Sequence, residues 1–130
     1  MSDNPYPHGT FCWNECMSTD VEKSKKFYTD LIGWQAEEHD MGAGPYTVMK
    51  SGDKMTSGMM AMPPEAKDVP SHWMAYIAVD NVDELAEKAK TLGGNVIHGP
   101  MDIPTVGRFV VLQDPAGAVV SLITMEQKSE

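Results

Sequence analysis

Positively charged residues are scarce in this chain. Its 130 residues include ten lysines and arginines against nineteen aspartates and glutamates, and the formal net charge at pH 7 is −9. Because binding to nucleic-acid phosphates requires a basic surface, a nucleic-acid partner is not expected. The acidic balance also repels anionic small molecules unless a local cation offsets it.

Long hydrophobic runs are absent as well. Hydrophobic residues make up 42% of the chain, yet no apolar stretch approaches the roughly eighteen residues that a membrane span needs. Residues 1–8 contain neither the basic nor the apolar segment of a signal peptide. We therefore expect a single domain over residues 1–130, located in the cytoplasm and without membrane contact.

Cysteine is limited to Cys12 and Cys16. In one extended strand these two residues would be about 13 Å apart, whereas a disulfide requires Cα atoms within about 7 Å. They are not expected to pair with each other. We interpret them as small hydrophobic residues in a reducing compartment.

The chain repeats itself at an offset of 61 positions. Without a gap, Gly33 falls on Gly94 and Asp53 falls on Asp114. Self-similarity at a fixed spacing is typical of a duplicated supersecondary unit. We therefore predict two copies of one unit within the domain, joined by a polar, proline-rich connector. The copies are residues 9–62 and 70–125, and the connector is residues 63–70.

Each copy has the pattern of one strand, one helix and three further strands. In the first copy, a Thr-x-x-Glu capping box at residues 19–22 predicts the start of the helix, and Gly33 predicts its left-handed end. Asn81 is the predicted cap of the second helix. One helix covers only one face of its strands, so the other face must pack against something else. We predict an α+β fold of two tandem βαβββ units, with a cupped, incompletely closed, eight-stranded mixed sheet, the helices outside, and a ligand cleft inside.

Three motifs resemble those of a known family. They are the aromatic run at residues 27–34, the Val-Asp-Asn element at residues 79–81, and the Asp-Pro-Ala-Gly turn at residues 114–117. Together with the paired units, they resemble the vicinal oxygen chelate superfamily, which includes glyoxalase I, bleomycin-resistance proteins, extradiol dioxygenases and several epimerases. The resemblance is to its small glyoxalase-like branch and implies the fold predicted above. It does not imply one activity, because this fold carries many chemistries.

The resemblance also identifies the positions where metalloenzymes of this family hold a divalent ion, typically with His and Glu. In this chain those positions are Trp13, Met60, Met74 and Ser121. Divalent cations of this kind prefer imidazole and carboxylate ligands, so we expect no bound metal and no cofactor. A displaced metal site that uses Glu15 and His72 is the alternative, because these residues share strand faces with Trp13 and Met74.

Without metal ligands, the cleft is expected to be apolar, aromatic and rich in methionine, as small-molecule sites commonly are. The residues predicted to line it are Trp13, Glu15, Met49, Met60, His72, Met74, Tyr76, Arg108 and Ser121. Arg108 is predicted either to neutralise an anionic ligand group or to form a surface ion pair. Glu15 is predicted either to act as a general base or to pair with Arg108 or His72.

Two functions follow from this composition. The first is metal-free binding of a small, largely apolar or aromatic molecule, as the resemblance to bleomycin-resistance proteins implies. The alternative is a glyoxalase-like lyase or isomerase, or a dioxygenase-type enzyme, that uses Glu15 and His72 or a displaced metal. A homodimer is expected in either case, because small members of the family commonly dimerise and two-fold dimers are the commonest soluble oligomers.

Overall fold

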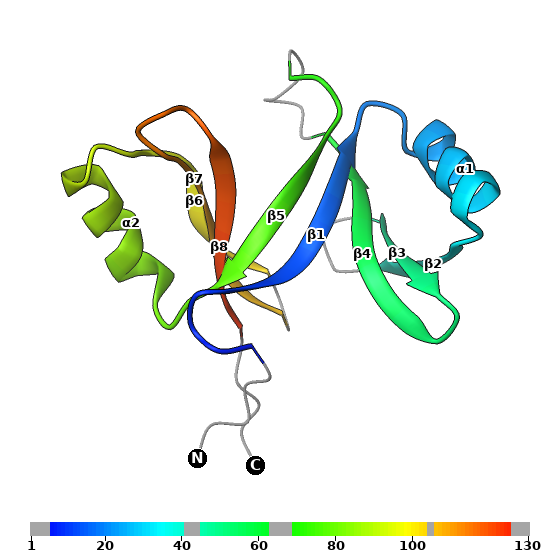
Figure 1. Cartoon of the computed structure of the whole chain (residues 1–130), viewed down its shortest axis with the longest axis horizontal. Helices are drawn as coiled ribbons and strands as arrows, with labels where there is room; N and C mark the ends of the chain where they lie inside the picture. The colour runs from blue at the N-terminus through cyan, green and yellow to red at the C-terminus, as the bar shows by residue number, and fades with distance from the viewer. Residues whose placement is uncertain (1–5, 41–44, 63–68, 104–105, 126–130) are drawn as a thin grey trace. The chain divides into compact units, whose positions relative to one another are not determined.

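The computed structural model describes residues 6–40, 45–62, 69–103 and 106–125 (Figure 1). Its elements, in chain order, are β1 (Thr10–Ser18), α1 (Val21–Ile32), β2 (Gln35–Asp40), β3 (Pro45–Ser51), β4 (Lys54–Ala61), β5 (His72–Ala78), α2 (Val82–Thr91), β6 (Asn95–Ile103), β7 (Gly107–Gln113) and β8 (Val119–Met125). This order is the predicted βαβββ unit twice. Residues 63–68 of the predicted connector lie outside the described residues.

The strands form a mixed sheet in the order β2-β3-β4-β1-β5-β8-β7-β6, and this sheet is not closed. β1 is parallel to β4 and β5 is parallel to β8, whereas the hairpin neighbours are antiparallel. The predicted α+β fold class, with a mixed open sheet and two helices, is confirmed. The chain separates into two compact units, which we call the N-terminal unit (residues 13–74) and the C-terminal unit (residues 1–12 and 75–130).

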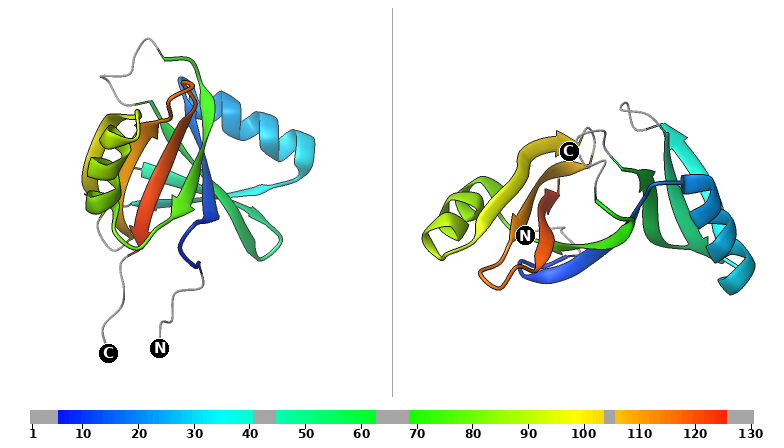
Figure 2. Two further views of the ribbon diagram at one scale, coloured as in Figure 1. Left: turned by 60° about the vertical axis from the view of Figure 1, so that its left-hand side comes forward. Right: turned by 90° about the horizontal axis from the view of Figure 1, so that it is seen from above.

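In the N-terminal unit, α1 covers one face of the strands (Figure 2). The core beneath it consists of the buried side chains of Cys16, Met49 and Met59, with partly buried side chains from α1 and β2 packed against them. Both cysteines are free, as predicted, and burial raises the pKa of each thiol. Both thiols are therefore neutral, and Cys16 lies in this core.

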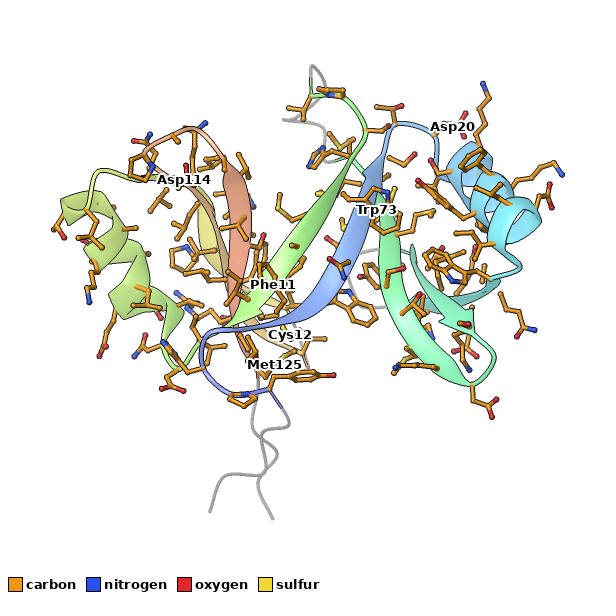
Figure 3. The ribbon with its side chains drawn as sticks, viewed as in Figure 1. Phe11, Cys12, Asp20, Trp73, Asp114 and Met125 are labelled. Carbon is orange, nitrogen blue, oxygen red and sulfur yellow. The ribbon has the colours of Figure 1, made fainter. Side chains whose placement is uncertain are left out.

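The cap of α1 differs from the predicted capping box. Asp20 is the N-cap, and its side chain accepts a hydrogen bond from the backbone N–H of Lys23 (Figure 3). Thr19 lies one residue outside the helix, and its backbone N–H donates to the Ser71 hydroxyl at 2.9 Å. The prediction was wrong by one residue, because Asp caps a helix as well as Thr does and the two residues are adjacent. The left-handed end at Gly33 is confirmed, with φ of 90°.

Four aromatic side chains join α1 to the rest of the N-terminal unit. The Tyr28 ring lies 5.8 Å from that of Trp34 and 5.5 Å from that of Trp73, and it meets Phe27 edge to face. Trp73 also donates a hydrogen bond from Nε1 to the Tyr28 hydroxyl at 3.1 Å. Because no residue of α1 is fully buried, this aromatic cluster carries much of the packing of the helix.

The C-terminal unit has a more conventional aliphatic core. Side chains of β5, α2, β7 and β8 enclose it, and its buried members are Val79, Val82, Ala86, Val110, Leu112 and Leu122. Asn81 caps α2 as predicted by accepting from the backbone N–H of Glu84. The Thr124 hydroxyl adds a second support, because it accepts from the N–H of Val82 and donates to the carbonyl of Val79, both at 3.0 Å.

Asp114 fastens the turn between β7 and β8 (Figure 3). Its Oδ1 accepts hydrogen bonds from the backbone N–H groups of Ala116 and Ala118, at 2.8 and 2.9 Å. We expect Asp114→Ala to lower the free energy of unfolding by about 1 kcal/mol, measured by urea denaturation, because both N–H groups lose a fixed partner. Asp53→Ala is the matched control, because Asp53 holds the same repeat position but makes no side-chain hydrogen bond in the described part of the chain. Equal losses in the two variants would contradict this prediction.

The two units keep the repeat only in part. In the parallel ladders, Glu15 pairs with Gly58, whereas Tyr76, 61 positions after Glu15, pairs with Ser121. Ser121 follows Gly58 by 63 positions, so the last strand of the C-terminal unit is shifted by two residues. The β3–β4 turn is tight, since Ser51 pairs with Lys54, but the loop between Gln113 and Val119 is longer. A shift of two residues preserves the face that each side chain occupies.

Candidate functional site

The N-terminal unit carries a chain of three hydrogen-bonded side chains on the sheet face away from α1. Trp13 donates from Nε1 to the Tyr46 hydroxyl at 3.0 Å, and Tyr46 donates to Oε2 of Glu15 at 2.7 Å. Glu15 is only 6% exposed, whereas Trp13 and Tyr46 are partly exposed. The chain of donors therefore leads from the surface to a buried carboxylate.

Strand alternation and one glycine produce this arrangement. Glu15 alternates with Cys16, so it points away from the core beneath α1. Gly58 pairs with Glu15 on one side and with Val48 on the other. The Tyr46 ring lies directly over Gly58, where a Cβ atom would overlap both the ring and the hydroxyl. A glycine is thus required at this position for Tyr46 to reach Glu15.

The surroundings keep Tyr46 protonated. Burial raises the pKa of its phenol above its usual range, and the charge of Glu15 and the hydrogen bond to it act in the same direction. The Trp13 donor opposes this shift but does not reverse it. Tyr46 is consequently a neutral phenol, and its hydroxyl donates its one hydrogen bond to Glu15.

A second group of predicted residues meets in the C-terminal unit. Tyr76 of β5 pairs with Ser121 of β8, and the Tyr76 ring lies 6.4 Å from Phe109, which in turn lies 6.0 Å from His98. Ser121 is fully buried, and its hydroxyl has no hydrogen-bond partner among the described residues. A buried hydroxyl without a partner is uncommon in folded proteins.

Arg108 does not lie on the predicted face. Its guanidinium donates to both oxygens of Asp83 on α2 and to Asp102 on β6, at 3.0 to 3.3 Å. It alternates with Phe109, which is on the Tyr76 face, and shares its own face with the core residue Val110. Of the two predicted roles, the structure favours the surface ion pair. The expectation that Arg108 lines the cleft is wrong.

We expect Arg108→Ala to leave the affinity for the expected ligand, a small apolar or aromatic molecule, unchanged. Both acidic partners belong to the helix side of the C-terminal unit, and the side chain is exposed, so only a solvent-screened ion pair is lost. Isothermal titration calorimetry with the wild-type protein and the variant measures this. A tenfold or larger loss of affinity would show that Arg108 contacts the ligand after all.

Met49 also departs from its predicted place. It is 0% exposed and packs with Cys16 and Met59 in the core beneath α1. The expectation that it lines an open cleft is wrong. The prediction for Arg108 is wrong for the same reason. Both residues lie in the third strand of a copy, where the prediction of the outward face relies on side chains alternating between the two faces. In β3, residues 47, 48 and 49 are all buried, so burial on both faces removes the alternation that would identify the outer face.

The remaining predicted residues occupy their strands as follows. Met60 is partly buried and pairs with Met17 across β1 and β4, and Met74 is buried in β5. His72 is the first residue of β5, and its Nδ1 lies 2.8 Å from the carbonyl of Pro70. Within the N-terminal unit, the structure thus brings Trp13 and Glu15 together through Tyr46, a residue that the sequence interpretation missed. The one available signal was the glycine at position 58, which leaves space beside Glu15.

The described residues do not fit a divalent cation. Outside the undescribed segments, no group of three or more His, Cys, Asp or Glu side chains is close enough to hold a metal ion. At the positions where the family implies ligands, the chain offers indole, thioether and hydroxyl groups, and Glu15 already accepts a hydrogen bond from Tyr46. Indole offers no lone pair, and thioethers suit soft metals instead.

Neither of the two described helices has the length and apolar character of a membrane-spanning helix.

Curated relatives resemble the chain over most of its length. CFP32 of Mycobacterium bovis, whose name describes a candidate glyoxylase, is 42% identical over 116 residues, which cover 88% of this chain and 44% of CFP32. The anthracycline biosynthesis protein DnrV of Streptomyces peucetius is 36% identical over 130 residues, covering 88% of this chain and 46% of DnrV. The chain thus spans less than half the length of these two relatives.

Solved structures share the fold at low sequence identity. Methylmalonyl-CoA epimerase from Mycobacterium tuberculosis superposes with a TM-score of 0.64 at 11% identity, covering 95% of this chain and 93% of the epimerase. An extradiol ring-cleaving dioxygenase from B. fuscum gives a TM-score of 0.62 at 17% identity, covering 99% of this chain and 36% of the dioxygenase. Residues 15–122 match the family's sequence pattern, and the chain therefore belongs to the Glyoxalase/Bleomycin resistance protein/Dioxygenase superfamily.

Proposed function

We propose that the chain binds a small, largely apolar or aromatic molecule, without a metal, at the sheet face of the N-terminal unit that carries Trp13, Tyr46 and Glu15. The observation that carries the proposal is the Trp13–Tyr46–Glu15 chain of hydrogen bonds. It fixes two aromatic side chains in place and leaves both partly exposed. Fixed aromatic groups beside a few oriented polar atoms are common in small-molecule sites.

The name of one relative points to the same class of ligand. DnrV is named for anthracycline biosynthesis, and anthracyclines contain a planar aromatic ring system. Such a ring system can stack on or beside an indole ring, and aromatic contacts contribute about 0.5–1.5 kcal/mol beyond the burial of area. The donor set described above also supports a metal-free site. The alternative remains a lyase or isomerase in which Glu15 acts as a base.

Thermal denaturation in the presence of an anthracycline and a panel of smaller aromatic molecules tests the proposal. A bound ligand raises the melting temperature of the protein by linkage. We expect a rise for the wild-type protein that Trp13→Phe reduces, with affinity falling roughly tenfold in calorimetry. Trp73→Phe is the matched control, because Trp73 belongs to the aromatic cluster of α1. Equal losses in both variants would contradict binding at Trp13.

Elemental analysis of the purified protein separates the two functional classes. Stoichiometric zinc, nickel, manganese or iron would contradict metal-free binding and would favour the enzymatic alternative. We also propose that the protein is a cytoplasmic homodimer, on the general frequency of two-fold dimers. Sedimentation equilibrium tests the oligomeric state, and a monomeric mass would contradict it.

A further inference from the structure

Two exposed apolar side chains lie one turn apart on the outward face of α1. Phe27 is 56% exposed and Leu31 is 66% exposed, and their spacing of four residues places them side by side on the helix surface. Val21 and Tyr28 make the contacts of the helix with its core instead. Apart from the edge-to-face contact of Phe27 with Tyr28, the packing of the N-terminal unit therefore makes little use of this pair.

The matched helix α2 does not carry such a pair. Lys88 lies 61 positions after Phe27 and is exposed. Leu92 lies 61 positions after Leu31 and is equally exposed, at 66%, but its neighbour one turn earlier is Lys88. A single exposed leucine is ordinary on a protein surface. The paired apolar side chains are thus a property of α1 that the repeat does not explain.

A charged pair runs beside the apolar pair. Nζ of Lys26 donates to Oδ2 of Asp30 at 2.8 Å, and both side chains are exposed. The base precedes the acid along the helix, which is the less favourable order for such a pair and for the helix dipole. A shallow depression on this face is lined by the apolar pair, the charged pair and Lys23.

This face is complementary to itself in the antiparallel direction. When two α1 helices are related by a two-fold axis near residues 28–29, Phe27 of each copy lies against Leu31 of the other. The same flank of both helices then faces the same way, so Lys26 of each copy lies beside Asp30 of the other. Each helix start also meets the end of the second helix, which offsets the unfavourable order of the charges. A parallel pair would instead place like charges together.

We propose that two copies of this chain associate through α1, as an antiparallel helix pair about a two-fold axis. The inference names the contact surface of the homodimer proposed above and rests on that homodimer, whereas it is independent of ligand binding. The twelve residues of α1 span about 18 Å. One face of such a helix is small beside the roughly 800 Å² per partner of a standard interface, so we expect weak association, with a Kd of about 1–100 µM.

Sedimentation equilibrium over the micromolar range tests the surface. We expect a reversible monomer–dimer equilibrium for the wild-type protein. Leu31→Lys places two like charges in the interface and should raise the Kd of the dimer at least roughly tenfold. Leu92→Lys is the matched control, because Leu92 has the same exposure and the same repeat position on α2. Both variants change the net charge equally, and thermal melting shows whether each is folded.

Charge reversal tests the antiparallel register. Lys26→Asp gives each helix two acids and Asp30→Lys gives each helix two bases, so each variant should associate with itself roughly tenfold more weakly than the wild type. An equimolar mixture should restore the dimer, because every acid of one variant then faces a base of the other. A mixture as weak as its components overturns the antiparallel pairing, and this result does not depend on the folding of Leu31→Lys.

The outcomes separate this inference from the proposals above. A wild-type dimer that Leu31→Lys leaves intact overturns the α1 interface alone. A wild-type protein that is monomeric throughout the series, whether or not it binds phospholipid vesicles through α1, overturns the proposed homodimer as well. Binding of a small molecule at Trp13 is measured separately and stands or falls without either result.

Discussion

Met49→Ala is expected to lower the free energy of unfolding by about 2–5 kcal/mol. The side chain is 0% exposed and packs between Cys16 and Met59 beneath α1. Truncation removes its buried thioether and leaves a cavity that the rigid strands fill only in part, which is the usual origin of losses of this size. Urea denaturation followed by circular dichroism measures the change, and an unchanged m-value would show that the unfolding transition is otherwise the same.

Met55→Ala provides the matched control for this prediction. Met55 lies in the adjacent β4 strand and is 58% exposed, so its truncation should change the stability by less than about 0.5 kcal/mol. Ligand affinity should be the same in both variants, because Met49 packs in the core on the opposite face of β3 from Tyr46 and Met55 makes no hydrogen bond to the Trp13–Tyr46–Glu15 chain. A stable Met49→Ala protein that has lost ligand binding would contradict the core position of Met49.

Gly58→Ala is expected to disrupt the hydrogen-bonded chain at Tyr46. A Cβ atom at position 58 would overlap the ring and hydroxyl of Tyr46, so the ring must move away. Overpacking of this kind costs about 1–3 kcal/mol. Glu15 also loses the Tyr46 donor, and a buried carboxylate that loses a hydrogen bond adds about 1–3 kcal/mol. Denaturation and calorimetry should therefore show a loss of stability together with a loss of ligand affinity.

The double variant Tyr46→Ala with Gly58→Ala separates this clash from a general intolerance of alanine in β4. Once the Tyr46 ring is gone, the three atoms nearest to a methyl group at position 58 are gone too, so the second substitution should cost less than it does alone. The difference is the coupling energy of the two positions. Additive losses would show that the two residues do not touch. The close approach of Tyr46 and Gly58 would then be wrong.

The order of elements could be predicted from the sequence because local signals specify it. The left-handed Gly33, the Asn81 cap and the Asp114 turn each act within a few residues, and the repeat supplies each pattern twice. Ambiguity arose only where two neighbours compete, as at the helix cap, where Asp20 took the place predicted for Thr19. The family could be recognised for the same reason, since its motifs lie at these turns and caps.

The site depended on contacts that no local pattern reports. Trp13 and Glu15 were predicted to share a face, but Tyr46, 31 positions after Glu15, joins them only because β3 and β4 pair in one particular register. The ungapped repeat suggested that Met60 corresponds to Ser121, whereas the ladders match Ser121 with Gly58. Strand register is set by bulges and turn lengths, which an offset between two sequence copies does not contain.

The sequence by itself determined the duplicated βαβββ order, the acidic charge and the absence of typical metal ligands at the positions that the family implies. Only the tertiary structure decided which face of β3 and β7 carries the site. It shows that Met49 and Arg108 lie outside the site and that Tyr46 belongs to it. In β3 the physical reason is that residues 47–49 are all buried. In β7 it is that residues 109–112 are all apolar although only Val110 and Leu112 are buried, so neither sequence shows the alternation that would mark a face. The orientation of each strand is fixed instead by pairing and packing with residues distant in the chain.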